Sequence, residues 1–179
     1  MIGAIMRSKT MLTALLLLGM VFFAQTAQAD PPQAQAYFAP DGNAKKAIIS
    51  HIENAKESIH VLSYYFSDPD IARALADASR RGVKIEAIFD AKVESKDKNP
   101  FLAREIKEAG ASVLLDGNHK TMHNKVIIYD GKTVQTGSYN LRNKIDKRNA
   151  ENVIFVTSDD IAKQYLNDFQ THKSHSKPY

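Results

Sequence analysis

The first 29 residues differ in their hydrophobic pattern from the rest of the chain. Arg7 and Lys9 precede an apolar run from Met11 to Ala24, and small residues in an A-x-A arrangement follow at Ala27 and Ala29. This order is typical of a secretory signal peptide (residues 1–29) that is cleaved after Ala29. An uncleaved membrane anchor is the alternative. It is disfavoured because the run of 14 residues is shorter than the roughly 20 that a bilayer-spanning helix needs.

From residue 30 onward, two kinds of hydrophobic spacing alternate along the chain. Ala47, Ile48 and Ile52 recur at helical spacing, whereas the β-branched and aromatic segment Ser58–Phe66 is typical of a strand. The patterns predict helices over about 43–55, 67–82, 100–110 and 158–171, and strands over 37–38, 58–66, 83–89, 112–115, 125–129, 133–136 and 153–156. Repeated strand–helix units followed by a hairpin predict one domain, residues 30–179, of the α/β class, with a mixed β-sheet sandwiched between helices.

Polar residues indicate where several of these elements begin and end. Ser67 and Asp70 resemble a capping box at the start of the second helix, and Ser158 opens the last one. Asp130-Gly131 is a strong two-residue hairpin signal between two predicted strands. Residues 172–179 are basic and polar, and we expect them to form a surface tail without a functional role.

Composition and charge narrow the possible functions only slightly. The chain holds 24 basic and 20 acidic residues; removing Arg7 and Lys9 with the signal peptide leaves residues 30–179 with a formal charge of +2. That charge is too small to predict a nucleic-acid partner without local clustering. The chain has no cysteine, which excludes disulfides and a thiolate zinc site.

Candidate chemistry lies at the start of the predicted strand 125–129. The two-residue period of a strand places His123 and Lys125 on the same face. Lys125 can supply a point positive charge for phosphate oxygens, and His123 can be a neutral nucleophile or a protonated acid near neutral pH. An imidazole and an ammonium group together suit an anion better than a hydrophobic core.

A second polar group follows the partner strand of the hairpin. Ser138 and Asn140 share one face if the strand geometry continues, and they add a hydroxyl and an amide without adding charge. Glu151, just before the last predicted strand, is the natural candidate to hold one nitrogen of His123 and fix its tautomer.

These residues resemble the phospholipase D superfamily, whose signature is H-x-K-x4-D, then G-S-x-N, then a downstream Glu. The matching residues are, in order, His123, Lys125, Asp130, Gly137, Ser138, Asn140 and Glu151. All three pieces around one hairpin form a much more specific signal than H-x-K-x4-D alone. The resemblance implies the superfamily fold and a phosphodiesterase that uses no metal and no cofactor.

The resemblance also implies a role for each residue. His123 would attack phosphorus and form a phosphohistidine, with Glu151 as its catalytic partner. Lys125, Asn140 and Ser138 would bind the substrate in place of metal ions. Asp130 belongs to the motif, but an Asp before Gly is also ordinary turn chemistry, so its role stays open.

One motif is fewer than the chemistry requires. Most of the superfamily carries two motifs per chain, whereas here His51, His60 and His119 lack the Lys and Asp that would complete a second copy. The resemblance therefore implies a homodimer in which two copies of His123 meet at one shared site, one attacking phosphorus and the other protonating the leaving alcohol.

Three functions remain open at this point. A nuclease that cuts DNA with little sequence preference, with RNA as the alternative polymer, is favoured, because a basic group can follow a phosphate backbone. That group consists of Arg142, Lys144, Lys147 and Arg148. A phospholipase D-type hydrolase of membrane phosphodiesters and a catalytically idle nucleic-acid-binding module are the alternatives. We expect a secreted protein, periplasmic in a host with two membranes, that has no stable membrane association after signal cleavage.

The remaining histidines do not predict a metal site. His119 and His123 lie four residues apart, but the intervening residues lack the Glu of H-E-x-x-H, and the segment is expected to be a loop that leads into a strand. His51 and His60 fall on mostly apolar faces and are expected to fill the core or the surface.

Overall fold

The structure is a computed structural model that describes residues 33–95, 101–142 and 149–179. The expected signal peptide lies outside the described residues, as do Pro100 and the basic residues Lys144, Lys147 and Arg148. None of the described helices is both long enough and apolar enough to cross a membrane.

The described residues form strands and helices in an alternating order, as the hydrophobic pattern predicts. The strands are β1 (Gln33–Ala39), β2 (Ser58–Ser63), β3 (Phe66–Ser67), β4 (Lys84–Asp90), β5 (Ser112–Asp116), β6 (Lys125–Tyr129), β7 (Thr133–Gly137), β8 (Leu141–Arg142), β9 (Glu151–Thr157) and β10 (Lys177–Pro178). The helices are α1 (Ala44–Asn54), α2 (Pro69–Arg80), α3 (Ala91–Glu94), α4 (Phe101–Glu108) and α5 (Asp159–His175).

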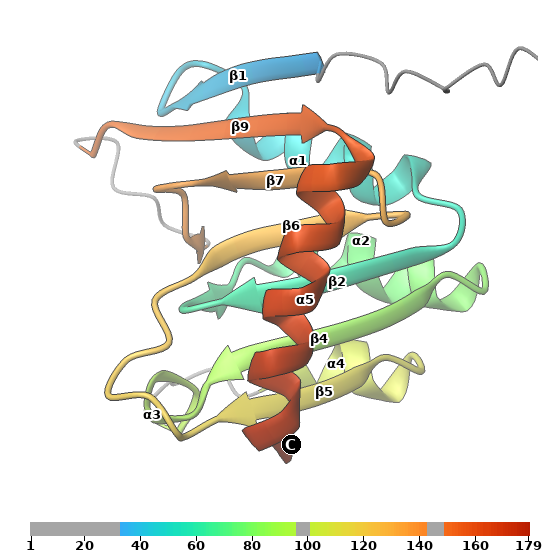
Figure 1. Ribbon diagram of the computed structural model, residues 1–179, viewed down its shortest axis with the longest axis vertical. Helices are drawn as coiled ribbons and strands as arrows, with labels where there is room; N and C mark the ends of the chain where they lie inside the picture. The colour runs from blue at the N-terminus through green and yellow to red at the C-terminus, as the bar shows by residue number, and fades with distance from the viewer. Residues whose placement is uncertain (1–32, 96–100, 143–148) are drawn as a thin grey trace, which may run out of the picture.

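One mixed sheet organises the molecule, with the strand order β1-β9-β7-β6-β2-β4-β5-β10. Strands β2, β4 and β5 are parallel to one another, and the remaining pairs in this sheet are antiparallel. Helix α5 lies across one face of the sheet, and α1, α2 and α4 cover the other (Figure 1). The α/β fold with a mixed sheet between helices is therefore confirmed.

Each face of the sheet buries its own hydrophobic cluster. Ile48 and Leu75 are fully buried in the cluster beneath α1, α2 and α4, whereas Phe169 of α5 packs into the opposite cluster with Leu62 and Ile128. Burial of one such side chain contributes about 1.5–3 kcal/mol, so the two clusters hold the sheet between its helices. His51 is half-buried and stacks on Phe155, with 3.9 Å between the ring centroids, so it lies at the margin of the core.

Two expectations about the ends of helices are wrong. The residue that caps α2 is Asp68 rather than Ser67, because its carboxylate accepts the backbone N–H groups of Asp70 and Ile71. Helix α5 continues to His175, and Lys177–Pro178 pairs with β5. Residues 172–179 therefore pack against the domain, because the side chains of the last helical turn meet a buried carboxylate on β5, as described below.

Candidate active site

One edge of the sheet brings the separated parts of the motif together. Strand β2 ends where β6 begins, with Ser63 paired to Lys125. Strand β7 ends where β9 begins, with Gly137 paired to Val153. Because β6 and β7 are antiparallel neighbours, all four of these strand ends lie at the same edge. The sheet topology thus places the histidine, the lysine, the G-S-x-N segment and the glutamate on one side of the molecule.

His123 and Lys125 lie in direct contact at the start of β6. The Nζ atom of Lys125 lies 3.3 and 3.4 Å from the two ring nitrogens of His123 and 3.0 Å from its backbone carbonyl oxygen. The ring of Tyr64, which follows β2, lies 4.6 Å from the His123 ring between centroids, and Lys125 Nζ lies 5.4 Å from the Tyr64 centroid. His123 is exposed, whereas Lys125 is only 9% exposed.

The buried ammonium group of Lys125 is not paired with a carboxylate in the described part of the chain. Burial lowers the pKa of Lys125, and the nearby charge of Glu151 offsets only part of that effect. Among the described residues, no carboxylate lies within ion-pair distance of Lys125. A buried charge without a counter-ion is costly, so this position favours an anionic ligand such as a phosphodiester.

Gly137 and Ser138 connect the end of β7 to the start of β9. Gly137 has a φ of +147°, and a Cβ atom there would lie 2.3 Å from the carbonyl oxygen of Asn152, so no larger residue fits. Ser138 donates its backbone N–H to that same oxygen, accepts the backbone N–H of Asn152 on Oγ, and donates its hydroxyl to Glu151. Ser138 thereby fixes the Glu151 carboxylate at this edge of the sheet.

The expected contact between Glu151 and His123 within one chain does not form. Ser138 is the hydrogen-bond partner of Glu151, and no hydrogen bond joins Glu151 to His123 in the described part of the chain. The reason is topological: β7 separates β9 from β6, which places their starts roughly 10 Å apart at about 4.8 Å per strand. The catalytic role of Glu151 stays a prediction, and the charge of Glu151 acts on Lys125 by raising its pKa.

Asn140 lies beside these residues with an incompletely satisfied amide. Its Oδ1 atom is buried and has no hydrogen-bond partner among the described residues. Unpaired buried polar atoms are rare in proteins because each costs about 1–3 kcal/mol. The unpaired atom is an acceptor, whereas a phosphate oxygen needs a donor such as the amide Nδ2, so the substrate-binding role of Asn140 stays a prediction.

Asp130 lies at the opposite end of β6 from His123. Its carboxylate accepts the backbone N–H groups of Lys56, Glu57 and Ser58, which lead into β2, at 2.7–3.1 Å. Burial opposes ionisation, but these hydrogen bonds lower the pKa of Asp130 below its ordinary value. Asp130 therefore anchors β2 to the hairpin rather than contacting the site. The hairpin is confirmed, although Tyr129 pairs with Thr133, so its loop holds three residues.

Replacing Asp130 by Asn should lower the free energy of unfolding by about 1–2 kcal/mol and leave kcat nearly unchanged. Asn tolerates the left-handed backbone of this position, φ 51°, and keeps one acceptor oxygen, but it loses the charge. Folding lowers the pKa of Asp130. The difference in the free energy of unfolding between wild type and variant is therefore complete above the unfolded-state pKa of about 3.9, and it disappears as the pH falls through the folded-state pKa. Urea unfolding across this range measures the difference. Equal stability at neutral pH, or a large loss of kcat, would contradict the anchoring role.

Sequence reasoning missed two residues that shape the site. Tyr64 was assigned to a strand, yet it follows β2 and contacts His123. Asp90 is buried at the end of β4; its Oδ2 accepts the backbone N–H of Met122 at 2.8 Å, and its Oδ1 caps α3. Asp90 thus holds the segment that leads into His123. An acidic residue directly after the hydrophobic strand VKIEAIF was the available signal, because carboxyl ends of parallel strands carry sites.

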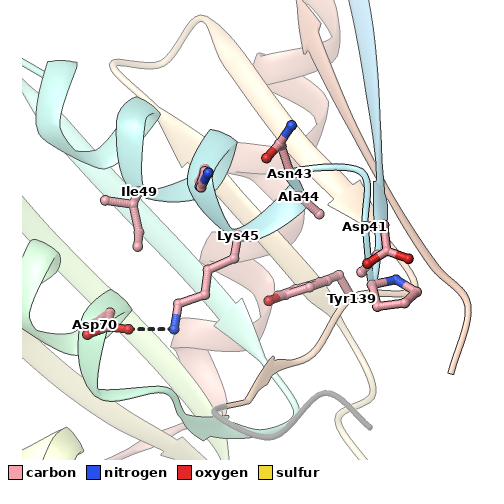
Figure 2. Close-up of a pocket in the computed structure, with 10 residues that line it drawn as sticks. Asp41, Asn43, Ala44, Lys45, Ile49, Asp70 and Tyr139 are labelled. Carbon is pink, nitrogen blue, oxygen red and sulfur yellow. Dashed lines mark hydrogen bonds and ion pairs between the residues drawn. The ribbon is translucent and has the colours of Figure 1, made fainter. Parts of the chain in front are cut away.

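A cavity of about 600 Å³ lies beside the motif, and Tyr139 of the G-S-x-N segment forms part of its wall. Figure 2 shows Lys45 directed at Asp70 within it. Burial opposes the charge of Lys45, but Asp68 and Asp70, at 2.8 and 2.6 Å, outweigh it and raise the pKa of Lys45. The positive charge of Lys45 is already balanced by two carboxylates, so Lys125 is the better phosphate-binding cation.

Comparison with known proteins agrees with this geometry. The family model described as "Cardiolipin synthase, PLD-like domain" matches residues 48–173, which include the whole motif. The chain belongs to the phospholipase D superfamily. Its membership confirms the resemblance found in the sequence and makes the chain a phosphodiesterase of that superfamily.

Relatives and solved structures of the phospholipase D superfamily cover most of the chain. The phospholipases D of Rickettsia prowazekii and Rickettsia typhi are 40% and 39% identical over 140 and 138 residues, or 78% and 76% of this chain. The chain spans about two thirds of their length, 67% and 66%. The crystal structure of Nuc, a phospholipase D family member from Salmonella typhimurium, has a TM-score of 0.79 at 31% identity and covers 83% of this chain and 99% of its own.

Proposed function

We propose that this phosphodiesterase is a metal-independent endonuclease that cuts DNA with little sequence preference, with RNA as a second polymer substrate. A strip formed by Tyr64, Tyr65 and Arg142, here called the tyrosine–arginine strip, carries the proposal. The rings of Tyr64 and Tyr65 lie 4.5 Å apart, and the Arg142 guanidinium lies 5.2 Å from the Tyr65 ring centre. The strip continues directly to His123 through Tyr64.

The tyrosine–arginine strip suits a nucleic acid because it combines the two contacts that sequence-independent binding needs. Half-buried tyrosine rings offer faces on which bases stack, worth about 1–3 kcal/mol per base, and a guanidinium group pairs with the phosphate backbone. A phospholipid headgroup has no base to stack. The predicted basic group continues from Arg142 into residues outside the described part of the chain.

The reaction we propose uses two copies of His123, one from each subunit. His123 of one subunit attacks phosphorus, and the P–O bond to the leaving alcohol breaks as His123 of the other subunit protonates that oxygen. The second histidine then deprotonates water, which hydrolyses the phosphohistidine. All six histidines of the chain lie in described positions, and His123 is the one in contact with Lys125. This supports a homodimer, because a single chain offers one suitable imidazole.

Hydrolysis of membrane phosphodiesters is the second candidate, favoured by the rickettsial relatives that are named phospholipase D. We retain it as the alternative outcome of the assay below. We also propose export to the periplasm followed by signal cleavage, after which the domain has no stable membrane association. A catalytically idle nucleic-acid-binding module is not proposed, because the chain is a phosphodiesterase.

The assay that tests the proposed function compares two substrates under metal-free conditions. Purified residues 30–179 should nick and linearise supercoiled plasmid DNA in excess EDTA at 25 °C, because Lys125 and Asn140 take the place of divalent cations. Vesicles that contain phosphatidylcholine and cardiolipin, incubated in parallel, should release headgroup at least about 100-fold more slowly, since no base stacks on the strip. Lipid turnover equal to or above DNA cleavage would favour the phospholipase. Loss of DNA cleavage in EDTA with recovery in Mg²⁺ would overturn the metal-independent mechanism.

A further inference from the structure

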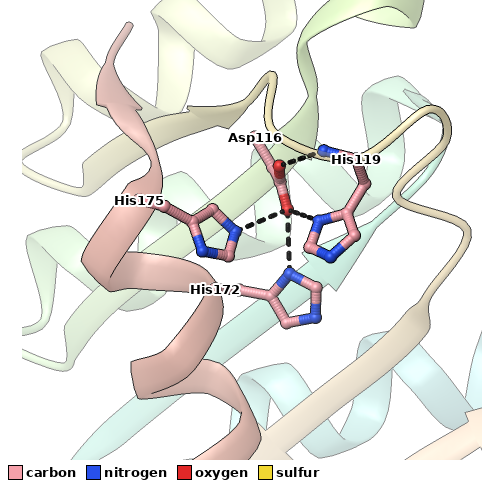
Figure 3. Close-up of side chains that lie close together, drawn as sticks. All are labelled: Asp116, His119, His172 and His175. Atoms are coloured by element: carbon pink, nitrogen blue, oxygen red, sulfur yellow. Dashed lines mark hydrogen bonds and ion pairs between the residues drawn. The ribbon is translucent and has the colours of Figure 1, made fainter.

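Three histidines converge on one carboxylate on the α5 face of the sheet (Figure 3). Asp116 ends β5, His119 lies in the following loop, and His172 and His175 occupy the last turn of α5. The Oδ2 atom of Asp116 lies 2.9 Å from His119 Nδ1, 2.8 Å from His172 Nδ1 and 3.2 Å from His175 Nε2. All four candidate ligand atoms lie within 4.8 Å of one another.

These distances are close to those of a tetrahedral zinc shell. Zn–N and Zn–O bonds of about 2.0–2.2 Å place neighbouring ligands roughly 3.4 Å apart at a tetrahedral angle. To admit an ion, the three imidazole nitrogens need to move away from Asp116 Oδ2, and ligand atoms that now lie up to 4.8 Å apart need to move towards one another. Their side chains come from one loop and one helix end, so such a movement changes no sheet pairing.

The carboxylate at the centre of the cluster has no fixed cation. The Asp116 side chain is fully buried, and within the described residues its ion-pair partners are the three histidines rather than a lysine or arginine. A carboxylate this deeply buried needs a compensating charge, which a divalent ion supplies.

We propose that Asp116, His119, His172 and His175 bind one Zn²⁺ ion as a structural metal site. Three imidazoles and one carboxylate are borderline ligands that suit zinc and its transition-metal neighbours, whereas Mg²⁺ and Ca²⁺ prefer oxygen shells. Asp116 Oδ1 already accepts hydrogen bonds from the backbone N–H groups of Asn118 and His119. Such hydrogen bonds from surrounding groups orient the ligands in metal sites. His119 is 44% exposed, which gives an ion access from solvent.

The site would stabilise the segment that carries His123. It joins the end of β5 and the loop that follows β5 to the end of α5, which lies far away in the sequence. The Asn124 amide, between His123 and Lys125, lies 3.3 Å from His172 Nε2. The zinc ion takes no part in phosphodiester cleavage, because its ligands are separate from His123 and Lys125.

Zinc titration of the metal-free protein tests the proposal. The mature chain, carrying an affinity tag without histidine, is stripped with chelator and titrated with ZnCl₂ while bound metal and Tm are measured. One Zn²⁺ per chain should bind, and Tm should rise by about 5–10 °C at a hundred-fold excess over Kd. Cobalt should give the visible absorption of a tetrahedral site. No zinc binding by the folded wild-type protein would overturn the proposal.

Matched variants locate the bound ion. His175→Ala and, separately, the exposed-loop variant His119→Ala should weaken zinc binding at least about 100-fold, because each removes one of four ligands. Gln170→Ala, an exposed position on the same helix, should bind like wild type. If both histidine variants retain wild-type affinity, the ion binds elsewhere and the proposal is wrong. Since metal content and Tm are the readouts, the result does not depend on which substrate the enzyme cleaves.

Discussion

Replacing His123 by Ala should reduce kcat for phosphodiester cleavage by at least about 10⁴-fold, because the variant loses the nucleophile and the acid together. The side chain is exposed and contacts Tyr64 and Lys125 rather than the core. Its removal should therefore change the free energy of unfolding by no more than about 0.5 kcal/mol. Turnover of plasmid DNA together with thermal unfolding separates lost chemistry from lost folding.

Two further variants make the result for His123 specific. Thr121→Ala, exposed in the same segment, should cleave like wild type, which controls for disturbance of the loop. His123→Asn should bind DNA with nearly wild-type Kd yet fail to cleave it, because Lys125 and the tyrosine–arginine strip remain. Label trapped on wild type should be stable in base and labile in acid, as a phosphohistidine requires. Near-normal turnover by either His123 variant would remove this residue from the proposed role.

Local patterns in the sequence predicted the elements and much of the site. The Asp130-Gly131 turn and the alternating strands that flank it gave the hairpin, because turn chemistry acts over a few residues. The same hairpin explains why His123 and the G-S-x-N segment meet, since antiparallel strands return the chain to its starting edge. The motif also predicts a glycine at position 137. The reason, the close approach of the Asn152 carbonyl oxygen to Gly137, is seen only in the structure.

Contacts between distant elements could not be predicted in the same way. The cluster around Asp116 joins β5 to the last turn of α5, and the spacing of His172 and His175, three residues apart, was the one local signal. Residues 172–179 were expected to form a tail because their composition is polar, a property that does not reveal a buried partner. The position of Glu151 depended on strand order, which placed β7 between it and His123.

Heterodimers of wild-type and His123→Ala subunits should have essentially no turnover. If one site uses both copies of His123, one as nucleophile and one as acid, loss of either copy stops the cycle. The two imidazoles are chemically identical before substrate binds, so substrate must leave one neutral and one protonated. With equal amounts and random pairing, only about a quarter of the dimers would be wild-type homodimers. Subunit exchange should therefore halve the activity of the unexchanged mixture.

The most direct measurement isolates that heterodimer with two different histidine-free affinity tags and determines its kcat on plasmid DNA. A shared site predicts turnover at the background of the His123→Ala homodimer, with wild-type homodimers from the same exchange fully active. Half the wild-type kcat in the purified heterodimer would show that each chain holds a complete site and would contradict the account.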